Sequence, residues 1–195
     1  MEYKLFTEPR FHDAQFYKDI ELANHWEQPG HGERLRMTFV RCAELLLEHP
    51  DIQTVSDWGC GNGRLLEELQ RMFPQRRYYG CDLLPANVED AKLRGYPVHY
   101  HDFVNDPTVT GNLAILTEVL EHLIDPHGLL KRLASYPDCH WIVASSPANE
   151  TKEEHYEFHS WVWTEWSYET MFSENGWPFV HSTNFAGARI VVAHR

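Results

Sequence analysis

The chain has 195 residues, with 17 Lys and Arg against 29 Asp and Glu, which gives a formal net charge of −12 at pH 7. Affinity for nucleic acid comes largely from Lys and Arg that displace counterions from phosphates, so this charge disfavours a general nucleic-acid binder. Hydrophobic residues make up 43% of the chain and charged residues 24%, values that exclude a disordered or fibrous chain. A globular domain with a sizeable core is therefore predicted.

The cysteines and the apolar segments indicate the compartment. Four cysteines at positions 42, 60, 81 and 139 form no C-x-x-C pair, which disfavours a zinc knuckle and a secreted disulfide framework. Residues 1–11 lack the apolar core of a signal peptide, and apolar runs such as 113–116 are far too short to span a bilayer. We expect a cytoplasmic protein with no membrane partner.

Apolar residues recur at spacings of three and four between Glu33 and Glu48, which predicts an amphipathic helix. Beyond Pro50, strand-like and helix-like segments alternate, a pattern that predicts a parallel sheet covered by helices on both faces. A helix and an antiparallel hairpin should end the chain, placing an antiparallel edge on the sheet. The expected strands are 54–58, 78–81, 98–100, 113–116, 141–145, 179–185 and 189–193, and the later helices are 64–72, 86–94, 126–135 and 164–174.

A glycine loop with the sequence DWGCGNG occupies positions 57–63, between the first strand and the next helix. Glycines at alternate positions let the backbone turn sharply beside a ligand, and the helix N-terminus behind them offers N–H groups. A dinucleotide-binding loop would need a third glycine where this chain has Arg64, so the loop disfavours NAD.

Acidic residues end the next two strands. Asp82 follows the last loop glycine by 82 − 63 = 19 residues, a position from which a carboxylate accepts hydrogen bonds from both hydroxyls of a ribose. Asp102 and Phe103 close the third strand. A carboxylate beside an aromatic ring suits a purine, whose exocyclic amine it binds while the ring stacks.

These three strand ends, in this order, resemble the class I S-adenosylmethionine-dependent methyltransferases over positions 52–195. The resemblance implies a Rossmann-like, doubly wound α/β fold with a seven-stranded sheet, mostly parallel with an antiparallel last strand. It also implies in-line transfer of a methyl group from S-adenosyl-L-methionine, whose sulfonium cation agrees with an acidic cleft. The cofactor-binding residues that it implies are Asp57, Gly59, Cys60, Gly61, Gly63, Asp82, Leu83, Asp102, Phe103, Glu118 and Arg34.

The sequence shows no internal repeat, low-complexity tract or linker, so we expect a single methyltransferase domain over 1–195. Within it, we expect an N-terminal helical cap at 1–50, a cofactor-binding core at 51–145 and a substrate-side segment at 146–195. In related enzymes a cap of this kind closes over the cofactor, and an arginine in it meets the cofactor's carboxylate. Arg34 and Arg36 are the candidates.

The segment TEVLEH at 117–122 follows the fourth strand. In a helical turn, Glu118, Glu121 and His122 stand at i, i+3 and i+4, so they share one face, which we expect to look into the cleft. In many methyltransferases a Glu-His turn of this kind lines the cofactor and substrate site. That resemblance implies Glu121 or His122 as a general base, with no metal ion.

A second resemblance adds the segment HSWVWT at 159–164. With Glu-x-x-Glu-His it resembles the RNA 3′-terminal ribose 2′-O-methyltransferases, in which two glutamates and two histidines bind a divalent metal ion. It implies Glu118, Glu121, His122 and His159 as metal ligands, with His159 also catalytic. The chain departs from that family in having Phe158 where an Asp is usual. Positions 133–188 also hold one basic residue, Lys152, against eight acidic ones, which disfavours an RNA substrate.

Aromatic residues gather near the end of the chain, with four of the seven tryptophans at 161, 163, 166 and 177. We expect Trp166, Met171 and Phe172 to pack the last helix on the sheet. The segment 155–163 should hang over the cleft and give an aromatic wall for the acceptor.

Our primary hypothesis is therefore a methyltransferase acting on a small molecule of aromatic or apolar character. The alternatives are a metal-assisted RNA ribose 2′-O-methyltransferase and a non-catalytic, cofactor-binding partner protein.

Overall fold

The computed structural model describes residues 2–4, 31–96, 98–100, 111–156, 158–185 and 187–195. A seven-stranded sheet in the order β4-β3-β2-β5-β6-β9-β8 forms its centre. The five strands from β4 to β6 are parallel. The strand bounds are β2 Thr54–Trp58, β3 Arg77–Asp82, β4 Val98–Tyr100, β5 Leu113–Thr117, β6 Trp141–Pro147, β8 Phe179–Phe185 and β9 Ala188–His194.

The last strand along the chain, β9, is reversed. It pairs antiparallel with β6 on one side and with β8 on the other. The predicted hairpin and the predicted antiparallel last strand are both confirmed. The hairpin gives the sheet the predicted antiparallel edge, in which β9 lies beside β6 and β8 is outermost.

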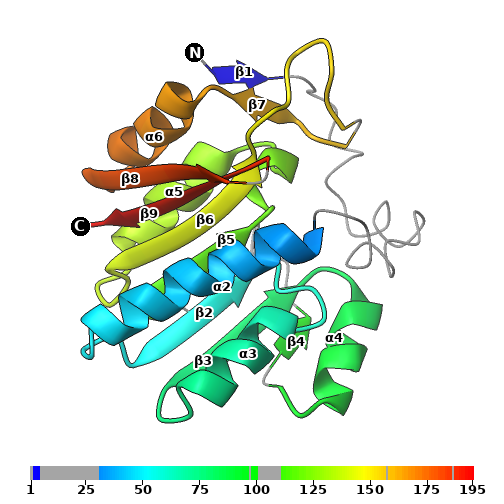
Figure 1. Ribbon diagram of the computed structural model, residues 1–195, viewed down its shortest axis with the longest axis vertical. Helices are drawn as coiled ribbons and strands as arrows, with labels where there is room; N and C mark the ends of the chain where they lie inside the picture. The colour runs from blue at the N-terminus through cyan, green and yellow to red at the C-terminus, as the bar shows by residue number, and fades with distance from the viewer. Residues whose placement is uncertain (1, 5–30, 97, 101–110, 157, 186) are drawn as a thin grey trace.

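Helices cover both faces of the sheet (Figure 1). On one face, α2, α3 and α4 bury apolar side chains such as Leu46, Leu66 and Val88 in one core cluster. On the other face, α5 and α6 contribute side chains such as Leu130 and Phe172 to a second cluster. The helix bounds are α2 His31–Glu48, α3 Arg64–Met72, α4 Pro85–Leu93, α5 Pro126–Ser135 and α6 Glu165–Glu174.

Local chemistry explains where several helices begin. Gly63 precedes α3 in the left-handed conformation, with φ 78°. Asp125 caps α5 by accepting a hydrogen bond from the Gly128 N–H, and Thr164 caps α6 by accepting one from the Ser167 N–H. Such caps satisfy N–H groups that the first turn leaves without a partner. Pro85 starts α4 at a position where the missing N–H costs nothing.

A second, two-stranded sheet was not predicted. Strand β7, Trp161–Trp163, pairs antiparallel with β1, Glu2–Lys4, in the register Glu2 to Trp163. The two partners stand at opposite ends of the sequence, so no local pattern links them. The pairing fixes the chain immediately after His159, at the carboxyl end of the central sheet.

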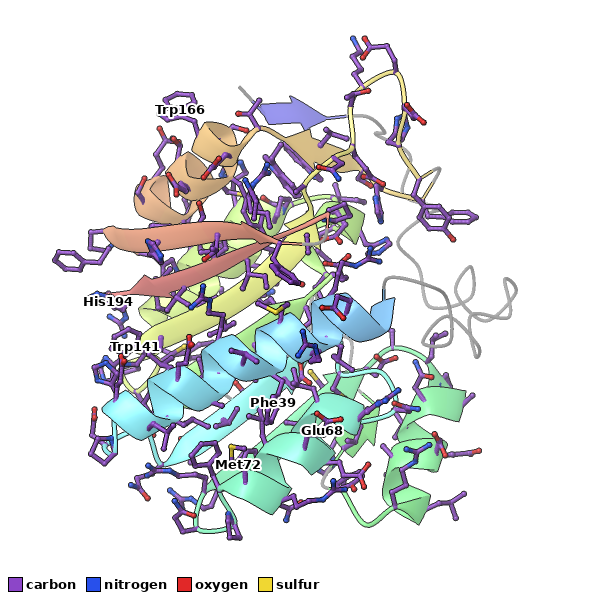
Figure 2. The ribbon with its side chains drawn as sticks, in the orientation of Figure 1. Phe39, Glu68, Met72, Trp141, Trp166 and His194 are labelled. Carbon is purple, nitrogen blue, oxygen red and sulfur yellow. The ribbon has the colours of Figure 1, made fainter. Side chains whose placement is uncertain are left out.

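The aromatic residues of the last third are distributed differently from the prediction. Met171 and Phe172 are buried as expected, but Trp166 is 67% exposed, so the prediction that it packs α6 on the sheet is wrong. Figure 2 shows Trp166 on the outer side of α6. Trp161 and Trp163 are buried rather than set over a cleft, and the Trp161 Nε1–H donates to the Leu123 carbonyl oxygen at 2.8 Å. They belong to the core beneath the site.

In the part of the chain that the structure describes, none of the helices has the length and apolar character that crossing a bilayer requires.

Candidate active site

The glycine loop lies at the carboxyl ends of β2 and β3. The N–H groups of Gly59 and Cys60 both donate to the Cys81 carbonyl oxygen, at 2.8 and 3.0 Å, which ties the loop to β3. Gly59, Gly61 and Gly63 all have positive φ, at 78°, 54° and 78°. L-residues with side chains rarely adopt this region, so the loop needs glycine for its backbone path.

Gly59 has a second constraint. A Cβ at this position would lie 2.7 Å from Cγ2 of Val119, a residue of the turn that follows β5. Such a separation is well inside van der Waals contact. The glycine loop and that turn therefore touch, and only glycine fits between them.

Asp82 holds the loop from the end of β3. Its Oδ2 accepts a hydrogen bond from the Gly61 N–H at 2.8 Å, and its Oδ1 accepts from the Leu84 N–H at 2.8 Å and from Asn87 Nδ2 at 3.3 Å. Burial raises the pKa of Asp82, although these hydrogen bonds favour its ionised form. A carboxylate has about four acceptor positions, so the predicted contact with a ribose still has room. Leu83, which was also predicted at the cofactor, follows Asp82 and is partly exposed.

Asp57 is a buried residue near the carboxyl end of β2, before the glycine loop. Its Oδ1 is buried and has no hydrogen-bond partner among the described residues. Burial, reinforced by the negative charge of Asp82, raises the pKa of Asp57 to about 8. Buried polar atoms are normally satisfied by protein, water or ligand. The unpaired Oδ1 of Asp57, below the glycine loop, fits a polar ligand bound at this edge of the sheet.

Three parts of the predicted site are placed less completely. Asp102 and Phe103 lie outside the described residues, as do residues 1 and 5–30 of the predicted cap at 1–50. Arg36 is exposed and pairs with Glu33 on its own helix, so it does not face the loop. Arg34, two residues earlier, reaches the edge of the sheet, where its Nε lies 3.0 Å from Glu118 Oε2.

Glu118 departs from the predicted helical turn. Its φ is +53°, the one positive φ among the described non-glycine residues, and the 3-10 helix η3 begins only at Leu120 and ends at His122. Because the left-handed residue breaks the helical path, the helical turn expected over 118–122 does not form. The Glu118 carboxylate is bound instead by the Ser145 hydroxyl at 2.9 Å and by Arg34.

Glu121, His122 and His159 are brought together. One potential ligand atom from each residue lies within 4.8 Å of the other two, and Glu118 is not part of this group. Glu121 is 0% exposed, and neither of its carboxylate oxygens has a hydrogen-bond partner within the described residues. Burial, together with the negative charge of Glu118, raises the pKa of Glu121 well above its usual range. A buried, unsatisfied carboxylate is costly unless a proton or a cation compensates it.

Hydrogen bonds set the orientation of both imidazoles. His122 Nδ1 lies 3.1 Å from the Phe158 carbonyl oxygen, and His159 Nδ1 lies 2.6 Å from Glu150 Oε2. Both partners are acceptors, so in the neutral form of each imidazole Nδ1 carries the proton and Nε2 carries the lone pair. A carboxylate and two imidazoles with Nε2 lone pairs form a donor set that suits a first-row divalent ion such as Mn²⁺ or Co²⁺.

Two residues of the site were not predicted from the sequence. Ser145 binds Glu118, and Glu150 binds His159. The available signal was their position, because both lie at or just beyond the carboxyl end of β6, the same edge of the sheet as the glycine loop. Tyr156 was predicted only as part of an aromatic wall. It lies beside His159, with the two ring centroids 5.2 Å apart.

Comparisons with known proteins agree with this architecture. The chain is 34% identical over 95 residues to trans-aconitate 2-methyltransferase of Acidovorax sp. (strain JS42), an alignment that covers 46% of this chain and 37% of that relative. Its structure is similar to the methyltransferase domain of bacterial CtHen1, at 19% identity and a TM-score of 0.64, with 83% of this chain and 100% of that chain covered. It is also similar to magnesium protoporphyrin IX methyltransferase (ChlM) from Synechocystis PCC 6803 with bound SAH, at 18% identity and a TM-score of 0.64, with coverages of 85% and 84%.

These structures share the fold with this chain, which confirms the predicted Rossmann-like sheet. The chain spans little more than a third of the length of the trans-aconitate enzyme. A family model described as a methyltransferase domain matches residues 32–186, which is most of the chain. The chain therefore belongs to the methyltransferase domain family, as the three strand ends predicted.

Proposed function

We propose that this methyltransferase transfers a methyl group from S-adenosylmethionine to an oxygen of a small-molecule acceptor, at a divalent metal site formed by Glu121, His122 and His159. The observation that carries the proposal is the convergence of these three donors within 4.8 Å around a carboxylate that is fully buried and unsatisfied among the described residues. Such a group has the composition of a ligand site, and no hydrogen bond among the described residues accounts for the burial of the Glu121 carboxylate.

The cofactor would lie over the glycine loop. S-adenosylmethionine supplies an electrophilic methyl group on its sulfonium. The residues of this chain then have three tasks. The loop glycines, which have no side chains, let the backbone approach the cofactor, Asp82 accepts hydrogen bonds from its ribose, and the acidic surroundings favour its positive charge. Arg34, at the same edge of the sheet, is proposed to meet its carboxylate.

The metal ion would be held by Glu121 and by the Nε2 atoms of His122 and His159. A divalent ion supplies Lewis acidity that helps an acceptor hydroxyl to lose its proton. The chain fits this role because Glu121 brings an uncompensated negative charge, and because both Nδ1 atoms are already engaged. The cost of burying Glu121 is then offset by the bound cation rather than by a proton.

The surroundings favour a small acceptor over a polynucleotide. Exposed carboxylates at Glu153, Glu154, Glu165 and Glu174 give the substrate side a negative surface, which repels phosphates. The rings of Tyr156 and Phe158 pack edge to face, with centroids 5.0 Å apart, next to His159. These rings suit a planar acceptor. The substrate named for the curated relatives, trans-aconitate, is a small molecule.

The second candidate function is methylation of the 2′-hydroxyl of an RNA 3′-terminal ribose. The same convergence of Glu121, His122 and His159 favours it, because a ribose end presents two adjacent hydroxyls to a metal ion. A bound cation would also reverse the negative field locally.

A labelled-methyl assay separates the two functions. The full chain would be incubated with methyl-labelled S-adenosylmethionine and Mn²⁺, and either with a low-molecular-mass cell extract or with a synthetic RNA that ends in a free ribose. We expect label in the low-mass fraction, and loss of that signal in Glu121→Gln but not in the matched surface control Glu174→Gln. Label in RNA that disappears with a 2′-deoxy end would overturn the small-molecule proposal in favour of the second. Transfer to neither acceptor, despite binding of S-adenosylhomocysteine, would overturn both.

A further inference from the structure

Glu150 is a half-buried carboxylate to which the predicted site assigns no task. It lies just beyond the carboxyl end of β6 and belongs to the same short segment as His159, with only 18% of its side chain exposed and 8% of the His159 side chain exposed. We propose that Glu150 is a positioning residue that fixes the tautomer and direction of the His159 imidazole for metal binding. This inference rests on the proposed function.

Both carboxylate oxygens of Glu150 form hydrogen bonds. Oε2 lies 2.6 Å from His159 Nδ1, and Oε1 accepts a hydrogen bond from the Tyr156 N–H at 2.9 Å. Two bonds to groups three residues apart hold the carboxylate against rotation. The imidazole is therefore aligned by a group that is itself fixed, which a single flexible contact would not achieve.

The direction of the His159 bond determines which nitrogen can bind a metal ion. An ionised carboxylate only accepts hydrogen bonds, so Nδ1 carries the ring proton and Nε2 keeps its lone pair. The opposite tautomer would present an N–H to the ion and could not bind it. The negative charge beside Nδ1 also makes Nε2 a stronger donor.

The two histidines of the site differ in how they are held. His122 Nδ1 is bound by a main-chain carbonyl, that of Phe158, whereas His159 depends on a side chain. Substitution can therefore remove the support of His159 and leave that of His122 in place. Glu150 is the position at which the metal site can be weakened without altering any proposed ligand.

The same segment offers a control for simple loosening of the loop. Thr151 closes a separate turn, in which its N–H donates to the Glu154 carbonyl oxygen at 2.8 Å and its Oγ1 accepts from the Glu154 N–H at 3.0 Å. Thr151→Ala removes one of these bonds beside Glu150 and leaves the Glu150–His159 bond in place. A role of Glu150 in loop structure alone would give both variants the same effect.

The test uses the full chain after removal of metals with EDTA. Co²⁺ is titrated into wild type, Glu150→Ala, Glu150→Gln, Thr151→Ala and His159→Ala, and binding is followed by calorimetry and by visible absorption. We expect Glu150→Ala to weaken Co²⁺ binding about 10- to 100-fold and to change the absorption bands, with Thr151→Ala like wild type. Glu150→Gln keeps the volume but accepts at one atom instead of two, so we expect it between wild type and Glu150→Ala.

A second readout needs no metal. In ¹⁵N-histidine-labelled protein, with His159→Gln used for assignment, His159 should show a protonated Nδ1 and an unprotonated Nε2, and a tautomer mixture in Glu150→Ala. Unchanged Co²⁺ affinity and an unchanged tautomer in both Glu150 variants would overturn the positioning role. The proposed function would still stand in that case, provided that wild type binds Co²⁺. Absence of Co²⁺ binding by wild type would overturn the metal site and this inference together.

Discussion

The imidazole rings of His122 and His159 lie edge to face, with their centroids 4.7 Å apart and an interplanar angle of 74°. They come from segments 159 − 122 = 37 residues apart, one in η3 and one just before β7. Each ring is already held through its Nδ1. A site in which both rings are oriented before any ligand arrives avoids the cost of ordering them on binding.

Gly59→Ala should destabilise the protein by more than positive φ alone explains. Gly95 has a similar φ of +83°, and a Cβ there would meet nothing within 4 Å, so Gly95→Ala measures the backbone cost, about 1–2 kcal/mol. Gly59→Ala adds the clash with Val119 and should also abolish binding of S-adenosylhomocysteine. Chemical denaturation and calorimetry measure both effects. Equal losses of stability in the two variants would show that the contact with Val119 does not matter.

Asp82→Asn should weaken both the glycine loop and the cofactor site. An amide has one acceptor oxygen, so it cannot satisfy the N–H groups of Gly61 and Leu84 as well as Asn87. We expect a loss of about 1–3 kcal/mol in the free energy of unfolding, and about tenfold weaker binding of S-adenosylhomocysteine. The control is Asp90→Asn, which removes only the exposed pair with Arg94. A wild-type affinity in Asp82→Asn would contradict the assigned role.

Asp57 should make the ligand-free protein less stable as the pH rises. Its pKa is about 8 in the folded state, against about 3.9 in an unfolded chain. Between those values the folded state keeps a proton that the unfolded state releases, so stability from this group is complete below pH 4 and is lost as the pH rises through 8. Asp57→Asn removes this pH-dependent contribution to the free energy of unfolding. Its melting temperature should exceed that of wild type by more at pH 8.5 than at pH 4.5, and a constant difference would refute the shift.

Arg34→Ala tests whether this arginine meets the carboxylate of the cofactor. Wild type should bind S-adenosylhomocysteine more tightly than 5′-methylthioadenosine, which lacks the carboxylate. The variant should lose affinity only for the first ligand, by about tenfold, as expected for a hydrogen bond to a charged group. Arg36→Ala, which breaks only a pair on the exposed face of α2, should behave as wild type. An equal loss for both ligands would assign Arg34 to holding Glu118 alone.

The sheet and its helices could be predicted because their signals are local. Buried β-branched runs, Pro85 and the cap at Thr164 all act within a few residues, and the element bounds agree closely with those predicted. Trp166 was misplaced because α6 has aromatic residues on more than one side, so that periodicity did not identify its buried face. Strand β7 was missed because its partner is at the other end of the sequence.

The site could be predicted in its residue types but not in its pairings. The spacing of Glu118, Glu121 and His122 indicated a shared role, yet it assumed a helical turn that the left-handed backbone of Glu118 prevents. Glu150 carried no motif at all. Its importance arises only when the end of β6 and the segment before β7 are folded together, because a side-chain hydrogen bond across nine residues leaves no periodic trace.

The contact between Gly59 and Val119 means that only the Val119 side chain separates the glycine loop, on the cofactor side, from the turn on the acceptor side. Val119 precedes η3, which carries Glu121 and His122, so we expect a displacement of the loop on ligand binding to move two of the three proposed metal ligands. Attempts to enlarge the acceptor side by shortening Val119 would also open the cofactor side. Selection for a new substrate should therefore recover paired changes in the two turns rather than single ones.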